Sequence, residues 1–138
     1  MRQILVKVLV KNRDRRLGGR ETIESTEIAI LCAQIADDKK AEDILVFDVR
    51  GLTVITDFFV LCSGINKRQL QGIAREIELK LHSYGIHGVG MEGYQDARWI
   101  LMDYGDVIMH LFDKETRHFY DLELLWGDAP KLSWKANT

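Results

Sequence analysis

The sequence has little proline, few cysteines and no long hydrophobic run. One proline and no extended polar tract in 138 residues argue against a disordered chain. Cys32 and Cys62 form no C-x-x-C pair, which argues against a zinc site or a redox motif, so we expect two small buried thiols. No apolar run approaches the roughly 20 residues that span a bilayer. Since 46% of the residues are hydrophobic, we expect one domain with a single core.

The sequence also lacks an excess of basic charge. Its formal net charge is −2 and its pI is about 6.1. Proteins that bind RNA through its phosphates are usually basic, so a general nucleic-acid binder is disfavoured. The charge is uneven, because residues 1–24 carry a net +4 and the remaining 114 residues carry −6. The acidic remainder suits a basic protein partner.

Residues 1–24 are predicted to form an N-terminal extension outside the core, flexible around Gly18-Gly19. Its apolar stretch, Ile4–Val10, is interrupted by a lysine and precedes most of the basic charge. That order is wrong for a secretory signal, so we expect a cytoplasmic protein. An organellar location is the alternative if the extension is a targeting segment.

Two amphipathic helices are predicted from apolar residues that recur every three or four positions. The first contains Ile28, Leu31, Cys32 and Ile35, with Ser25 or Thr26 as its N-cap. The second contains Leu70, Ile73, Ala74, Ile77 and Leu81; we expect Asn66 as its N-cap and Gly85 just after its end.

Five short apolar segments are predicted to be strands. They are Ile44–Val49, Phe58–Cys62, Gly88–Met91, Trp99–Asp103 and Val107–Phe112. The last two form a predicted β-hairpin around a Tyr104-Gly105 turn. The spacing of Phe119, Leu122 and Trp126 predicts a short helical turn that docks on the sheet, and residues 131–138 are predicted to be a loose tail. The order of elements favours an α/β (α+β) fold over residues 25–130, a single domain with a mixed sheet of about five strands and flanking helices.

The residues give little support for an enzyme, a metal site or a cofactor. The Cys62-Ser63-Gly64 turn lacks a Walker lysine and a G-x-G-x-x-G pattern, so we interpret it as a plain turn. Asp106 and His110 lie four strand positions apart, about 13 Å, which is too far to share one metal ion. Asp103 and Asp106 flank a tight turn and could approach each other, but carboxylates at a hairpin more often accept backbone N–H bonds or lie in solvent. No nucleophile elbow or H-E-x-x-H motif is present.

The hairpin also offers a candidate surface. Strand alternation places Trp99, Leu101 and Asp103 on one face, and Ile100 and Met102 on the other. Large aromatic residues beside an acid are typical of protein interfaces. The alternative is that Trp99 is a core residue and Tyr104 only a turn residue. The residues alone leave both interpretations open.

Several motifs together resemble the ribosomal silencing factor, or Iojap, family. They are DILVFDV (43–49), DFFVLCSG (57–64), Gln69 with Ile73-Ala74, MEG (91–93), WILMDYGDVIMHLF (99–112) and RHFYDLELLW (117–126). The resemblance runs from about Ser25 to Ala129. It implies a nucleotidyltransferase-like fold without the catalytic acids, because residues 65–72, after the Ser63-Gly64 turn, contain no carboxylate.

The resemblance further implies a function. Members of this family bind the large ribosomal subunit through its protein fourteen and sterically block joining with the small subunit, repressing translation under nutrient limitation. Alternatives are a large-subunit assembly factor and, from the enzyme class, a metal-dependent nucleotidyltransferase using Asp103 and Asp106. The family's partner-binding patch corresponds here to Trp99, Leu101, Asp103 and Tyr104, with Asp106 and His110 at its rim. A minor contact with ribosomal RNA through the arginines of residues 1–24, and a homodimer, stay open.

Overall fold

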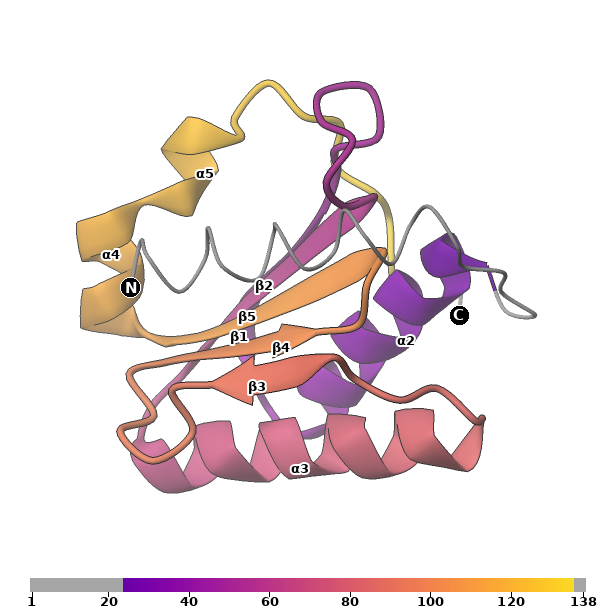
Figure 1. Ribbon diagram of the computed structural model, residues 1–138. Helices are drawn as coiled ribbons and strands as arrows, with labels where there is room; N and C mark the ends of the chain where they lie inside the picture. The colour runs from indigo at the N-terminus through magenta and orange to yellow at the C-terminus, as the bar shows by residue number, and fades with distance from the viewer. Residues whose placement is uncertain (1–23, 136–138) are drawn as a thin grey trace.

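The computed structural model describes residues 24–135 (Figure 1). Predictions for residues 1–23 and 136–138 therefore lie outside the described part of the chain. The helices are α2 (Ser25–Asp38), α3 (Lys67–Ser83), α4 (Lys114–Tyr120) and α5 (Leu122–Leu125). The strands are β1 (Glu42–Asp48), β2 (Phe58–Gly64), β3 (Gly90–Glu92), β4 (Trp99–Asp103) and β5 (Val107–Asp113).

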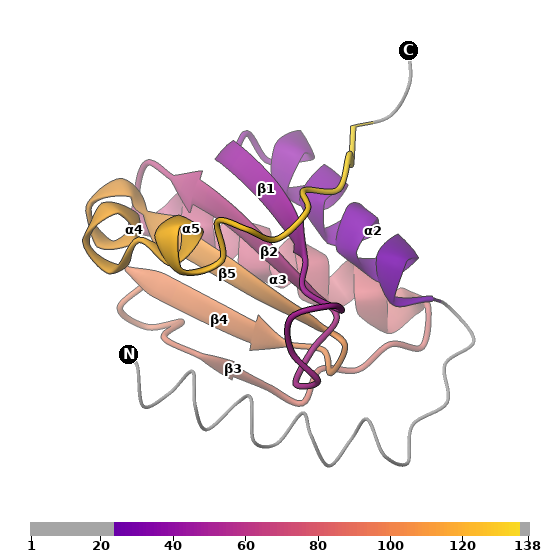
Figure 2. The ribbon, with the colours of Figure 1, turned by 90° about the horizontal axis from the view of Figure 1, so that it is seen from above.

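The five strands form one sheet in the order β1-β2-β5-β4-β3. Strands β2 and β5 are parallel, and the other neighbouring pairs are antiparallel. The predicted single domain with a mixed five-stranded sheet is confirmed, as is the hairpin between β4 and β5. Helices α2 and α3 cover one face, and α4 and α5 lie together at one end of the sheet (Figures 1 and 2).

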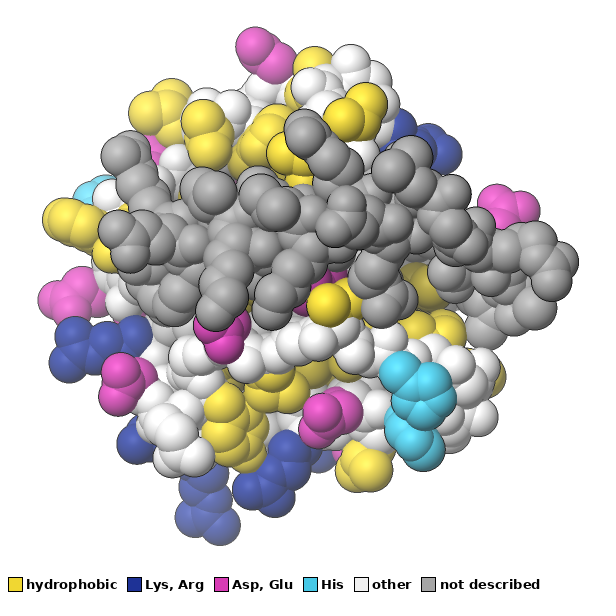
Figure 3. Space-filling view, in the orientation of Figure 1, with side chains coloured by type: hydrophobic (Ala, Val, Ile, Leu, Met, Phe, Trp, Pro, Cys, Tyr) yellow, Lys and Arg dark blue, Asp and Glu magenta, His cyan; other side chains and the backbone are white. Residues whose placement is uncertain are grey.

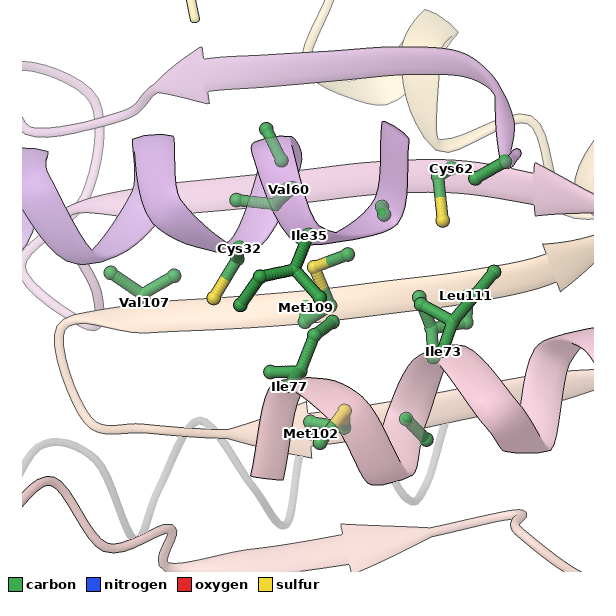
Figure 4. Close-up of a cluster of buried hydrophobic side chains, with 14 of the residues drawn as sticks. Cys32, Ile35, Val60, Cys62, Ile73, Ile77, Met102, Val107, Met109 and Leu111 are labelled. Carbon is green, nitrogen blue, oxygen red and sulfur yellow. The ribbon is translucent and has the colours of Figure 1, made fainter. Parts of the chain in front are cut away.

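The sheet carries a hydrophobic cluster on each face. The larger cluster lies beneath α2 and α3, and Figure 4 shows part of it, including Cys32, Ile77, Met102 and Met109. The second cluster contains Trp99, Leu101, Phe59 and Phe112, with Leu122 and Trp126 packed against them. Both thiols are free and buried as predicted, and burial raises the pKa of each to about 12.

The helix ends agree with the sequence except at the start of α2. Asn66 caps α3, because its side chain accepts a hydrogen bond from the Gln69 backbone N–H at 2.8 Å. Gly85 follows the C-cap with φ +78°, as predicted. The predicted Ser25 or Thr26 cap of α2 is wrong. Glu24 is the N-cap and forms a capping box with Glu27, while the Ser25 hydroxyl donates to Asp57 Oδ2.

The predicted docking turn near the C-terminus is only partly right. Leu122 is buried and Trp126 packs on the sheet, but Phe119 is 77% exposed. Asp121 adopts a left-handed conformation, φ +45°, and separates α4 from α5. Because this break resets the helical phase, Phe119 no longer shares a face with Leu122 and Trp126.

The segment that follows Pro130 is not a loose tail as far as residue 135. Lys131 forms a bridge with Phe47, and the Leu132 N–H donates to the Val46 carbonyl at 2.8 Å. The Trp134 indole N–H donates to the Ile44 carbonyl. These bonds occupy polar groups at the outer edge of β1, which the sequence alone leaves unpaired. Within residues 24–135, no helix is long and apolar enough to cross a membrane.

Candidate partner-binding site

The six predicted site residues all lie in the β4–β5 hairpin. The predicted division of faces is confirmed, since Trp99 and Leu101 join one cluster and Ile100 and Met102 join the other. His110 lies opposite Leu101 on β5. Tyr104, however, packs in the cluster beneath α2 and α3. The structure therefore brings Trp99, Leu101 and His110 together and places Tyr104 on the other side of the sheet.

Five of the six residues are buried. Trp99 is 2% exposed and His110 is fully buried, while Leu101, Asp103 and Tyr104 are nearly so. Asp106 alone is half-buried. Direct contact with a buried member of this set requires a partner to displace atoms that cover it in this structure. Contact with a partner at these positions therefore stays a prediction. Moving the covering atoms away would reduce the free energy gained on binding.

The indole of Trp99 lies at the centre of an aromatic cluster. Its ring centroid is 4.9 Å from those of Phe112 and Tyr120. Its N–H donates to Nδ1 of His110 at 3.0 Å, so the buried indole nitrogen is satisfied. Since Tyr120 belongs to α4, these contacts attach α4 to the sheet.

His110 is a neutral imidazole within this cluster. Burial lowers its pKa to about 3. Because Nδ1 accepts the Trp99 bond, the proton lies on Nε2, which has no hydrogen-bond partner in the described part of the chain. His110 is thus fixed in one tautomer. In the described residues, no group of three His, Cys, Asp or Glu side chains is arranged to hold a metal ion.

Asp103 stabilises the hairpin turn. Its Oδ1 accepts the Gly105 backbone N–H at 2.8 Å, and Gly105 has φ +86°, a value that favours glycine. The Tyr104 N–H closes the turn on the Val107 carbonyl. The prediction that a carboxylate here accepts a backbone N–H is confirmed for Asp103. Burial also raises the pKa of the Tyr104 phenol.

Gly64, the last residue of β2, has a packing role. A Cβ at Gly64 would lie 2.7 Å from Cδ2 of Leu70, so a larger residue would force the buried Leu70 side chain to shift. Glycine therefore suits the close contact between the end of β2 and the start of α3. The prediction of a turn at Cys62-Ser63-Gly64 is wrong, because all three residues pair with β5 as part of β2.

A groove of about 540 Å³ opens beside Trp99. It is lined by Gly93, Asp96, Arg98, Trp99, Glu115, Thr116, Phe119 and Tyr120. Trp99 is the only one of the six predicted residues in this lining. Hydrophobic side chains gather over α4 and α5 on the surface, where Phe119, Leu124 and Leu125 are exposed (Figure 3).

Sequence reasoning missed the contribution of Phe119 and Tyr120 to this groove. Helical spacing placed Phe119 in the core, because the left-handed Asp121 was not foreseen. The one available signal was Asp121 itself, since aspartate tolerates that conformation better than most residues.

The fold and the groove define a class of small α/β protein. Helices α2 and α3 cover one face of its sheet, and a largely apolar groove lies between β4 and α4. The family model described as "Ribosomal silencing factor during starvation" matches residues 22–138. The ribosomal silencing factor RsfS of Bacillus subtilis is 48% identical over 100 residues, which are 72% of this chain and 85% of that protein. The chain belongs to the ribosomal silencing factor family.

Further relatives agree in sequence and in fold. The chloroplastic protein Iojap of Arabidopsis thaliana is 36% identical over 110 residues, 79% of this chain and 45% of that protein. A crystal structure of a Chromobacterium violaceum protein has a TM-score of 0.74 at 33% identity and covers 83% of this chain and 95% of that one. A Bacillus halodurans structure has a TM-score of 0.70 at 38% identity, covering 79% and 99%.

Proposed function

We propose that this protein docks on the large ribosomal subunit, chiefly on ribosomal protein fourteen, and sterically prevents joining of the small subunit. Repression of translation under nutrient limitation follows from that block. The proposed action is binding without catalysis, in the cytoplasm. Membership of the ribosomal silencing factor family supports association with the ribosome.

The observation that carries the proposal is the groove between β4 and α4. Its lining combines the buried Trp99 with Tyr120 and the exposed Phe119, and it also carries three exposed charged residues, Asp96, Arg98 and Glu115. Aromatic anchors with polar residues at the periphery are typical of protein interfaces. The net −6 of residues 25–138 favours a basic partner such as a ribosomal protein.

The six hairpin residues have different proposed roles. Trp99 is the anchor that a partner reaches through the groove, and Asp106 is the accessible acid at the turn. Leu101 and His110 hold Trp99 in place, while Asp103 and Tyr104 hold the turn. The four supporting roles follow from burial, because a side chain with no exposed surface gains little from direct contact unless the site opens. Trp99 is also buried, and it is assigned the contact role because it lines the groove.

The test is sedimentation of purified large and small subunits with and without the protein. We expect fewer joined ribosomes when the protein is present, and we expect the protein to sediment with free large subunits. Equal joining with and without the protein would contradict the block. If the protein sediments with large subunits but the joining of the two subunits is undiminished, the alternative of a large-subunit assembly factor is favoured.

A Trp99→Ala variant tests the anchor. We expect a loss of roughly 2–4 kcal/mol in binding to large subunits, the usual scale for an interface hot spot. Because Trp99 also supports the fold, its variant must be compared with Leu122→Ala, which removes a buried side chain of the same cluster outside the groove. Similar losses of binding in both variants would show a stability effect instead of a contact.

A further inference from the structure

The side of the molecule where α4 approaches β1 and β2 holds a second pocket, separate from the groove beside Trp99. Its volume is about 440 Å³, and it is lined by Asp43, Leu45, Ser63, Lys114, Arg117, His118 and Glu123. Trp99 and the other five predicted site residues are not part of this lining. The proposed docking on the ribosome does not use the pocket.

Arg117 is the unusual residue of this pocket. It is only 7% exposed, and its guanidinium is held by two of the other lining residues. Nε donates to Glu123 Oε1 at 2.9 Å, and Nη1 donates to the Ser63 hydroxyl at 2.9 Å. Nη2 has no acceptor within the described residues. A buried charged donor without a partner is rare in native proteins, which indicates that an acceptor from outside the chain completes the site.

The geometry of the guanidinium indicates the acceptor. Nε and Nη2 form one edge of the guanidinium, the edge that a carboxylate can bind with both oxygens. Glu123 contacts this edge through Nε alone and leaves Nη2 open. The Glu123 side chain is 39% exposed, so a small movement of it admits a ligand oxygen to Nη2.

The charges of the residues that line the pocket favour a carboxylate over a phosphate as the bound anion. Arg117 and Lys114 are balanced by Glu123 and Asp43, and Lys114 is also paired with Glu42 at 2.6 Å. A doubly charged phosphate therefore enters a site with no net positive charge. Glu123 and Asp43 repel a singly charged carboxylate less than they repel a doubly charged phosphate. Asp43 also attracts an ammonium group on the same molecule.

Asp43 lies in a locally distorted part of β1. Its φ is +51°, and the register of β1 against β2 shifts between Glu42 and Leu45. A bulge of this kind re-aims side chains at the edge of a sheet, and here it accompanies the placement of a carboxylate in the pocket wall.

We propose that this pocket binds a small zwitterion of the α-amino acid type, with its carboxylate on Arg117 Nη2 and its ammonium group beside Asp43. Ser63 and Glu123 hold the guanidinium in place.

The test follows the side-chain Nε–Hε NMR signal of Arg117 while glycine, acetate or inorganic phosphate is added at constant ionic strength. The signal is assigned from its absence in Arg117→Lys. We expect saturable shifts with glycine, severalfold weaker binding of acetate, and the weakest binding with phosphate. Shifts no larger than those of the exposed Arg50 would overturn the site, because they would reflect general salt effects.

An Asp43→Asn variant tests the proposed ammonium contact separately from the proposed carboxylate contact, because it leaves Arg117 unchanged. Asparagine tolerates a positive φ, so the fold should be retained. We expect the preference for glycine over acetate to disappear and the binding of phosphate to strengthen. Asp128→Asn, the same charge change at an exposed position outside the lining, is the matched control and should change neither. An unchanged preference in Asp43→Asn, or phosphate binding tighter than glycine in the unmodified protein, would overturn the assignment.

Discussion

The indole N–H of Trp99 donates to Nδ1 of His110 at 3.0 Å, across the neighbouring strands β4 and β5. This bond fixes the tautomer of a fully buried histidine and the orientation of the residue proposed as the anchor of the interface. Burial lowers the His110 pKa from its ordinary 6.5 to about 3.

This pKa predicts a loss of stability in mild acid. Between pH 6.5 and about 3 the unfolded chain binds a proton at His110 that the folded chain does not, so the free energy of unfolding falls as the pH falls. From about pH 7 to 5 the expected contribution is about 2 kcal/mol, at no more than about 1.4 kcal/mol per pH unit.

Urea unfolding at the two pH values measures this contribution, with His110→Gln as the control. Glutamine does not titrate, and its amide oxygen can still accept the Trp99 N–H. The difference between the two proteins isolates His110 from other acid-sensitive groups. Parallel losses of stability in both would contradict the assignment.

Gly93 is predicted to resist substitution. It has φ +82°, and a Cβ there would lie 2.1 Å from the Trp99 carbonyl oxygen. We expect Gly93→Ala to lower the free energy of unfolding by about 2 kcal/mol or more, because strain and a backbone clash add. Gly72→Ala is the control, since its Cβ meets nothing within 4 Å in α3, and it should raise stability by up to about 1 kcal/mol. Equal effects of the two variants would refute the packing argument.

Both cysteines are predicted to be unreactive in the folded protein. Cys32 and Cys62 are fully buried, and their pKa values near 12 leave almost no thiolate at neutral pH. A thiol reagent followed by absorbance should modify neither residue in buffer and both in denaturant. Rapid modification of the native protein would show that the core beneath α2 opens far more readily than its packing implies.

Phe119 is predicted to contribute to binding and not to stability. Because it is 77% exposed, Phe119→Ser should change the free energy of unfolding by less than about 0.5 kcal/mol. Its position in the groove predicts about tenfold weaker binding to large subunits, measured by sedimentation. The control is Leu79→Ser, 67% exposed on α3, which should bind normally. Equal binding by both variants would exclude the groove from the interface.

Much of the fold was predictable because it depends on local periodicity. The spacing of Leu70, Ile73 and Ile77 predicts α3, and alternation in Trp99–Asp103 predicts which residues share a face. Asn66 and Gly85 mark the ends of α3 through backbone chemistry that acts over a few residues. The family resemblance, carried by the hairpin and by residues 117–126, is likewise a property of the sequence.

The remaining features depend on contacts between distant residues. Alternation shows that Trp99 and Leu101 share a face but not whether that face is covered, and the structure buries both. The left-handed Asp121 separates α4 from α5, so Phe119 is exposed at the groove and does not share a face with Leu122. The bond from Arg117 to Ser63 joins residues 54 positions apart. The sequence by itself determined the elements, their faces and the family, because these follow from local patterns. Only the tertiary structure decided which side chains reach the surface, because burial depends on every element packed around a residue.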